Sequence, residues 1–239
     1  MIAEDPKSEE IIKPILRGRD IKRYHTNWAE LWLIATFPSL HLDIENYPAI
    51  KRHLLTYGIE KLEQAGKTLP DGNKSRKRTP HAWFELQDTC AYHAEFYQEK
   101  IVYPETMRRA KHLDNGFPRV SLDLYGEFIT DKTAFILTGE NLRYIVALLN
   151  SKLMRFLIPL YVYSWDDSGF LMQKIFVERL PVPKITAAEQ PPFIHIVDSI
   201  LQAKAANPGV NTRAAEAEID QLVYQLYNLT DEEISLVES

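Results

Sequence analysis

Three short basic segments hold many of the side chains in this sequence that could bind a phosphate or a base. Residues 13–25, 67–78 and 100–119 each carry five Lys or Arg against one or two acids. Lys and Arg contact phosphates, whereas Arg, Asn and Gln also pair with base edges in the major groove. Local basic loops on a neutral body favour a surface that meets phosphate at selected places, although solvated loop charge gives the same composition.

The second segment lies within a long polar loop, residues 66–80 (GKTLPDGNKSRKRTP). A loop of this length in a compact domain is usually functional or disordered. It offers both base-reading and phosphate-binding side chains, so we expect it to enter or straddle a DNA groove. The candidate DNA contacts over the whole chain are Arg17, Arg19, Lys22, Arg23, Asn73, Lys74, Ser75, Arg76, Lys77, Arg78, Arg108, Arg109, Lys111 and Trp165.

Some of these candidates have a second interpretation. Arg17 and Arg19 lie beside Asp20, and they could equally pair with acids that fix the first strand. Trp165 lies in the polar stretch SWDDSG (164–169), which makes it the better candidate for stacking on a base. Trp83 lies in an apolar stretch, and we expect it to pack in the core instead.

No catalytic motif accompanies the basic segments. HExxH, CxxC, GxSxG and Walker patterns are absent, Cys90 is the one cysteine, and the seven His lack metal-ligand spacing. Asp20 and Lys22 fit one end of a metal-dependent nuclease site, but that site needs a second carboxylate, so a salt-bridged structural Asp20 is favoured. The tetrad QPPF (190–193) is similar to one in DNA amino-methyltransferases, yet no Gly-rich cofactor loop precedes it, and it predicts a helix start.

The net charge of −5 conceals an asymmetry along the chain. Residues 1–185 hold 26 basic and 24 acidic residues, whereas residues 186–239 hold two basic and nine acidic ones. We therefore divide the chain into an α/β body, 1–185, and a C-terminal helical subdomain, 186–239. We expect the acidic helices to pack on the body or on a catalytic partner, away from phosphate.

The elements that must hold these side chains follow from hydrophobic periodicity. We expect an α/β (α+β) fold: a mixed, largely antiparallel sheet with packed helices and a C-terminal helical tail. Thr230 and Glu233 form a capping box for the last helix. Strands are predicted at 31–37 (buried), 101–103, 119–138 (two or three) and 170–183, and helices at 48–65, 89–99, 141–157 (capped by Asn141), 193–206, 212–227 and 230–237.

The N-terminal residues are too acidic for a signal peptide, and no apolar run approaches the roughly 18 residues of a membrane span. These features predict a cytoplasmic protein with no membrane partner.

An ordered set of motifs runs across nearly the whole chain. It comprises LRGRDIKRY (16–24), Trp32, YPAIKRHL (47–54), WFEL (83–86), KIVYP (100–104), LLNSKL (148–153), LPVP (180–183) and EIDQLVYQLY (218–227). In this order and spacing the sequence resembles the TaqI-like C-terminal specificity domain of type IIG restriction–modification enzymes and related adenine-specific DNA methyltransferases.

The resemblance implies that the body, 1–185, is a DNA target-recognition domain. In that family an upstream methyltransferase domain binds S-adenosylmethionine and methylates N6 of a flipped adenine, and some members also carry a nuclease domain. The implied partners are double-stranded DNA and the methyltransferase or nuclease portion, with no cofactor and no catalysis in this chain. Two alternatives stay open: a protein-interaction module that docks a methyltransferase through its acidic helices, and a metal-dependent nuclease built on Asp20 and Lys22.

Overall fold

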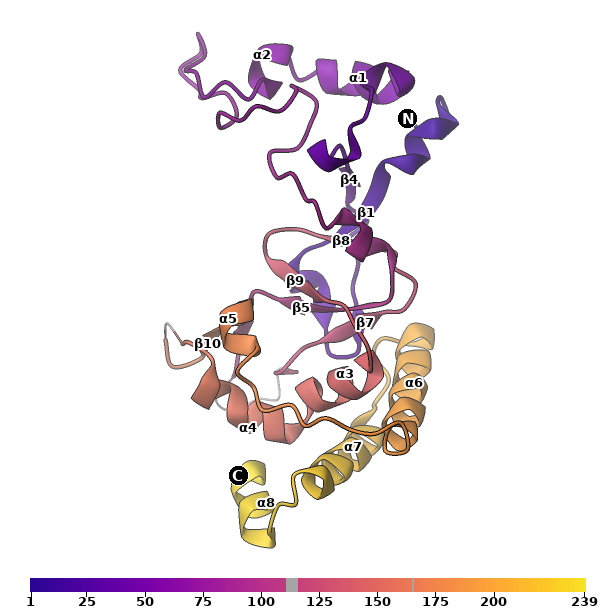
Figure 1. The fold of residues 1–239 in the computed structure, drawn as a ribbon, viewed down its shortest axis with the longest axis vertical. Coiled ribbons are helices and arrows are strands. Elements are labelled where there is room, and N and C mark those ends of the chain that lie inside the picture. Colours follow the sequence, from indigo (N-terminus) through magenta and orange to yellow (C-terminus); the bar gives the residue numbers. More distant parts are fainter. Residues whose placement is uncertain (111–115, 165) are drawn as a thin grey trace. The chain divides into compact units, whose positions relative to one another are not determined.

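The computed structural model describes residues 1–110, 116–164 and 166–239, and these form two compact units (Figure 1). The candidates Lys111 and Trp165 lie outside the described residues. The first unit comprises Met1–Ile15, Glu30–Tyr97 and Glu127–Ile129, and the second comprises Leu16–Ala29, Gln98–Gly126 and Thr130–Ser239.

The first unit is built on a small sheet with strand order β4-β1-β8. Its buried core consists mainly of Ile11, Ile12, Ile44, Tyr47 and Ile50. Its elements are η1 (Pro6–Glu10), β1 (Ile12–Leu16, shared with the second unit), β4 (Trp32–Ile34), η3 (Pro38–Leu40), η4 (Ile44–Asn46), α1 (Pro48–Leu55), α2 (Ile59–Leu62), η5 (His93–Tyr97) and β8 (Ile129–Thr130, also shared).

Three sequence expectations for this unit are wrong. The strand expected to be buried at 31–37 is the edge strand β4, and Trp32 on it is 55% exposed. The single helix expected at 48–65 breaks at Gly58, whose φ of +86° lies in the left-handed region that ends a helix. The helix expected at 89–99 is only the 3-10 turn η5. The spacing of the apolar residues does not reveal where a helix breaks, because one long helix and two short helices joined by a turn can show the same apolar spacing.

The second unit contains a three-stranded antiparallel sheet with order β7-β5-β9, in which Ile101 pairs with Leu122 on one side and Leu137 on the other. The strand prediction for 119–138 is therefore confirmed in part, although β7 and β9 both flank β5. The remaining elements are η2 (Gly18–Asp20), β2 (Ile21–Lys22), β3 (His25–Thr26), β5 (Lys100–Pro104), β6 (Thr106–Arg108), β7 (Ser121–Asp123), β9 (Ala134–Leu137), α3 (Leu142–Asn150), α4 (Lys152–Tyr161), β10 (Gly169–Leu171), α5 (Lys174–Val177), α6 (Gln190–Ala206), α7 (Arg213–Leu226) and α8 (Asp231–Glu238).

One buried cluster unites the sheet and the helices of the second unit. Ile101 of β5, Leu148 of α3, Val197 of α6 and Val223 of α7 all belong to it. The expected mixed α/β fold with packed helices and a helical tail is thus confirmed, including the capping box of Thr230 and Glu233. The functional boundary at residue 185 stays a prediction.

The helix expected at 141–157 is two helices that meet at a bend of 79°. Ser151 causes the break: its backbone is extended, and its hydroxyl accepts from the amide of Met154 as the cap of α4. Asn141 does not cap α3 through its side chain, because it adopts a left-handed conformation. The strand expected across 170–183 is limited to β10 and is followed by the short helix α5.

No single helix in the described ranges is both long and apolar enough to cross a membrane. The bent pair α3–α4 reaches that composition only jointly, and much of its apolar surface lies in the core.

Candidate nucleic-acid interface

The opening motif, 16–24, folds into a tight turn that is closed by its own charges. Arg17 donates to Asp20 through Nε at 2.9 Å and Nη2 at 2.8 Å, and the same guanidinium lowers the pKa of the Asp20 carboxyl. The expectation of a salt-bridged structural Asp20 is confirmed. No group of three or more metal-ligating side chains occurs among the described residues.

Gly18 places this turn against the strand connection at Thr133. The amide of Gly18 donates to Thr133 Oγ1 at 2.8 Å, and a Cβ on Gly18 would lie 2.3 Å from the Thr133 carbonyl oxygen. The position therefore requires glycine because of close backbone approach. On the same turn Arg19 is exposed, and Lys22 donates through Nζ to the Arg19 carbonyl at 2.7 Å.

The basic loop of the first unit is a braced hairpin. Residues Thr68 and Lys74 form an antiparallel bridge, and the Asp71 carboxylate accepts from both the backbone amide and the side-chain amide of Asn73. Ser75 is buried, where its hydroxyl accepts from the amide of Lys67. These contacts give the loop one shape before any ligand arrives.

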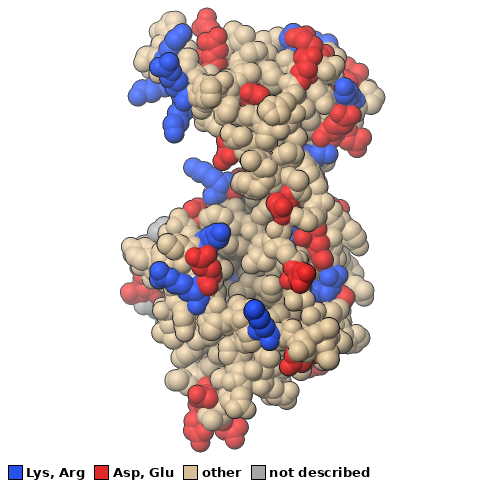
Figure 2. All heavy atoms as spheres, in the orientation of Figure 1, with Lys and Arg blue, Asp and Glu red and all other residues tan. Residues whose placement is uncertain are grey.

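Arg76 fixes the base of the loop. Its guanidinium donates to the carbonyl oxygens of Leu62 at 3.3 Å, Trp83 at 3.2 Å and Glu85 at 2.7 Å. Burial lowers the pKa of this guanidinium. Arg76 and Ser75 therefore bind protein groups, and their roles as DNA contacts stay predictions. Four candidates are left exposed on the braced loop: Asn73, Lys74, Lys77 and Arg78. Figure 2 shows Lys and Arg side chains gathered beside α2, on the part of the chain that holds this loop.

The third basic segment contributes Arg108 and Arg109 at the end of β6, in the second unit. Arg108 is 60% exposed and pairs with Asp166 at 2.9 Å. The carboxylate of Asp166 accepts from the backbone of Ser168, from Arg108 and from the backbone of Gly169, and these bonds lower its pKa to about 2. The amide of Arg109 donates to the Ser168 carbonyl, and its side chain lines a hollow.

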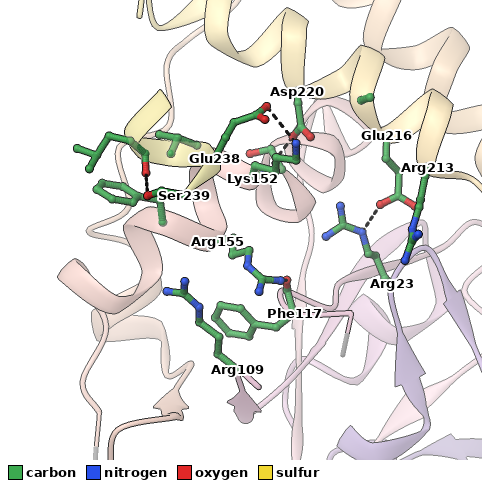
Figure 3. Close-up of a pocket in the computed structure, with 15 residues that line it drawn as sticks. Arg23, Arg109, Phe117, Lys152, Arg155, Arg213, Glu216, Asp220, Glu238 and Ser239 are labelled. Atoms are coloured by element: carbon green, nitrogen blue, oxygen red, sulfur yellow. Dashed lines mark hydrogen bonds and ion pairs between the residues drawn. The ribbon is translucent and has the colours of Figure 1, made fainter. Parts of the chain in front are cut away.

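That hollow, of about 610 Å³, is the arginine pocket of the second unit (Figure 3). It joins the end of the opening motif to α4, α7 and α8, and it contains cations, acids and two phenylalanines. The residues that define it are Arg23, Arg109, Phe117, Ser151, Lys152, Arg155, Phe156, Arg213, Glu216, Ala217, Asp220, Leu236, Val237, Glu238 and Ser239.

Ion pairs hold the walls of the arginine pocket. Arg23 pairs with Glu216 of α7, and Lys152 pairs with Glu238 of α8 at 3.0 Å. The Asp220 carboxylate accepts from the amide of Lys152 at 2.8 Å, while burial raises the pKa of this carboxyl. Acids of the C-terminal helices thus compensate cations of the body.

Sequence reasoning missed Arg119, Lys152, Arg155, Lys204 and Arg213 as members of basic surfaces of the second unit. A signal was available for three of them, since Arg119 belongs to the basic segment 100–119, and Lys204 and Arg213 are the only Lys or Arg after residue 185. The predicted contacts are distributed over both units: the loop candidates belong to the first, and the opening-motif and β6 candidates to the second.

These basic surfaces consist of cations that several elements of a mixed α/β fold supply. A family model described as the TaqI-like C-terminal specificity domain matches residues 13–182, well over half of the chain. The chain therefore belongs to the TaqI-like C-terminal specificity domain family, and the resemblance predicted from its motifs is confirmed.

Among solved structures, the chain is similar to the type IIL restriction–modification enzyme MmeI, determined in complex with DNA. The TM-score is 0.59 at 14% sequence identity, and the match covers 98% of this chain and 30% of that one. This likeness shows the fold, and the chain spans less than a third of the length of that enzyme. No curated protein matches the chain.

Proposed function

We propose that this chain is the DNA target-recognition module of a type IIG-like restriction–modification enzyme. In this role it reads a base sequence and positions the duplex for N6-adenine methylation by a catalytic domain of the parent enzyme. The family assignment supports the proposal, as does the fold shared with an enzyme whose structure contains DNA.

The observation that carries the proposal is the braced basic loop of the first unit. Its buried or half-buried members, Ser75 and Arg76, bind backbone groups, whereas Asn73, Lys74 and Lys77 are exposed beside them. A loop held in one conformation loses little entropy on binding, which favours specific contacts. An amide side chain suits adenine, and ammonium groups suit phosphates.

Selection from a randomised duplex library tests the proposal with the full chain. Wild type should enrich one defined motif, and Asn73→Ala should relax one or two positions of that motif, by about 1–3 kcal/mol of discrimination. Lys77→Gln should weaken binding to all duplexes alike, and Lys174→Gln on α5 is a charge-matched control. Binding without any enriched motif would leave a non-specific DNA-binding protein and refute the reading role.

The proposal assigns S-adenosylmethionine, and any nuclease activity, to the catalytic portion of the parent enzyme. Calorimetry of S-adenosylmethionine with this chain should show no saturable heat, whereas the chain mixed with its catalytic portion should bind the cofactor. Saturable binding to this chain alone would contradict the assignment.

The competing function, a docking module without base readout, has one observation in its favour. Glu218 on α7 and Glu232 on α8 are exposed acids that could meet a cationic partner. Glu218→Lys with Glu232→Lys should leave motif selection intact. If the variant instead loses association with the catalytic portion, and wild type selects no motif, docking is the function.

A further inference from the structure

The second unit contains a second, smaller basic hollow of about 380 Å³, which shares Arg23 and Glu216 with the arginine pocket and which we call the hairpin hollow. Lys22, His25 and Asn27 come to it from the β2–β3 hairpin, Arg119 from the segment before β7, and Lys204 from the C-terminal part of α6. Arg23, Gly116 and Glu216 complete its lining. None of the sequence motifs brings these elements together.

Charge in the hairpin hollow is strongly unbalanced. Among the described residues, Glu216 is the one carboxylate in its lining, and Arg23 already pairs with it. The ammonium group of Lys204 donates to the backbone carbonyls of Val210 at 2.8 Å and Pro208 at 3.3 Å. Carbonyl oxygens orient this cation without neutralising it, so its charge stays available to an anion.

Arg119 strengthens this imbalance. It is half-buried, and in the described part of the chain it has no ion-pair partner. Burial lowers the pKa of its guanidinium, and no carboxylate of the described residues offsets that effect. Partial burial of a cation without an acid beside it costs desolvation free energy. An anion that binds there would offset this cost.

His25 lies among the same positive charges. Burial is the first cause that lowers the pKa of its imidazole, and the positive charges of Lys204 and Lys22 lower it further. Its Nδ1 lies 3.1 Å from the Arg23 carbonyl oxygen, which makes Nδ1 the protonated nitrogen in the neutral ring.

The scaffold around the hollow is preorganised. Lys22 lies directly opposite His25 in the hairpin, and the amide of Tyr24 at the turn donates to the Val120 carbonyl at 3.0 Å. The buried side chain of Asn150 also holds Val120, donating to the same carbonyl at 2.9 Å and accepting from the Val120 amide at 3.0 Å. The backbone next to Arg119 is therefore fixed relative to the hairpin.

We infer that the hairpin hollow is an anion site that takes a phosphodiester group of the DNA backbone, with Arg119 and Lys204 as its principal ligands. This inference rests on the proposed function for the source of the phosphate, but the site itself follows from the charges. Such a contact fixes the register of the module on the duplex and carries no base information. Through Lys204, the acidic C-terminal helices take part in binding a polyanion.

The test uses the full chain, a mixed-sequence duplex of about 30 base pairs and the variant Arg119→Gln/Lys204→Gln. The double variant loses one phosphate contact. The slope of log affinity against log salt should therefore become shallower by about 0.9, and affinity should fall about 8-fold at ~0.1 M salt. Target and non-target duplexes should weaken by the same factor. Lys174→Gln/Lys184→Gln, which removes two exposed charges elsewhere in the unit, should match wild type. Circular dichroism and Tm check that both variants fold.

A second arm separates this site from the proposed function. Inorganic phosphate is titrated against wild type while the His25 ring signals are followed by NMR. Saturable shifts that disappear in Arg119→Gln/Lys204→Gln support the anion site, even if wild type fails to bind DNA and the proposed function falls. If wild type binds DNA and the variant keeps its salt slope, or if phosphate leaves the His25 signals unchanged, the anion site is refuted.

Discussion

Arg76 and Arg78 lie two positions apart in the basic loop, yet the structure gives them opposite roles. The guanidinium of Arg76 donates to three backbone carbonyls of the first unit, whereas Arg78 is exposed. We therefore predict that Arg76→Gln mainly destabilises the first unit and that Arg78→Gln mainly weakens DNA binding.

The magnitudes follow from the contacts. A hydrogen bond from a charged donor contributes about 1.5–3 kcal/mol. Two of the three Arg76 bonds are long, at 3.2 and 3.3 Å, and the side chain is only half-buried. We expect Arg76→Gln to lower the free energy of unfolding by about 2–4 kcal/mol. Arg78→Gln should change stability by less than about 0.5 kcal/mol, because its side chain is exposed and has no buried partner among the described residues.

For DNA binding the order reverses. Arg78→Gln should reduce the salt slope by about 0.9 and the affinity about 8-fold at ~0.1 M salt, as for one phosphate contact. Arg76→Lys separates bracing from charge, because lysine keeps the charge but cannot reach three carbonyls with one planar fork. We expect Arg76→Lys to unfold nearly as easily as Arg76→Gln.

Urea denaturation followed by tryptophan fluorescence measures the stability of each variant, with Trp83 beside Arg76 as a reporter. Fluorescence anisotropy across a salt series measures DNA binding. If Arg76→Gln unfolds like wild type and loses as much DNA affinity as Arg78→Gln, the bracing role is wrong.

Three further predictions concern the second unit. Lys100→Met should lower the unfolding free energy by about 3–5 kcal/mol, since it removes the ammonium that lies 2.5 Å from the fully buried carboxyl group of Asp123; a loss below about 1 kcal/mol in calorimetry would contradict this. Gly18→Ala should cost about 1–3 kcal/mol by thermal unfolding, because its Cβ meets a carbonyl oxygen, and a Tm equal to that of wild type would show that the turn can shift. Arg17 lowers the pKa of Asp20, so the pair's contribution to stability is present above the unfolded pKa and is lost as pH falls through the folded pKa. Asp20→Asn should therefore reduce the loss of unfolding free energy at acid pH. An acid-pH dependence equal to that of wild type would argue against the pair.

Much of the fold was accessible from local sequence patterns. The helices α6, α7 and α8 and the capping box of α8 were predicted because their signals span only three or four residues. The family motifs were recognisable for the same reason, and the salt-bridged Asp20 was anticipated from its basic neighbours. The break at Ser151 was missed because the apolar stripe continues across it.

The candidate site was likewise predictable only in part from the sequence. Sequence alone identified the basic loop and the opening motif, since charge density and turn residues are local properties. It could not separate Arg76 from Arg78, because the carbonyl partners of Arg76 are supplied by α2 and by residues after the loop. It did anticipate that the acidic helices pack on the body, whereas their expected distance from phosphate stays a prediction.

Only the tertiary structure decides which charges remain available. Arg23 and Glu216 pair across 193 positions of sequence, and Lys204 reaches the same hollow as Lys22 and Arg119. The physical reason is that ion pairing and burial depend on distance in space, whereas composition averages over the chain. The sequence by itself determined the family, the elements with strong local signals and the presence of basic loops. The fold determined which of those cations bind protein groups and which stay exposed.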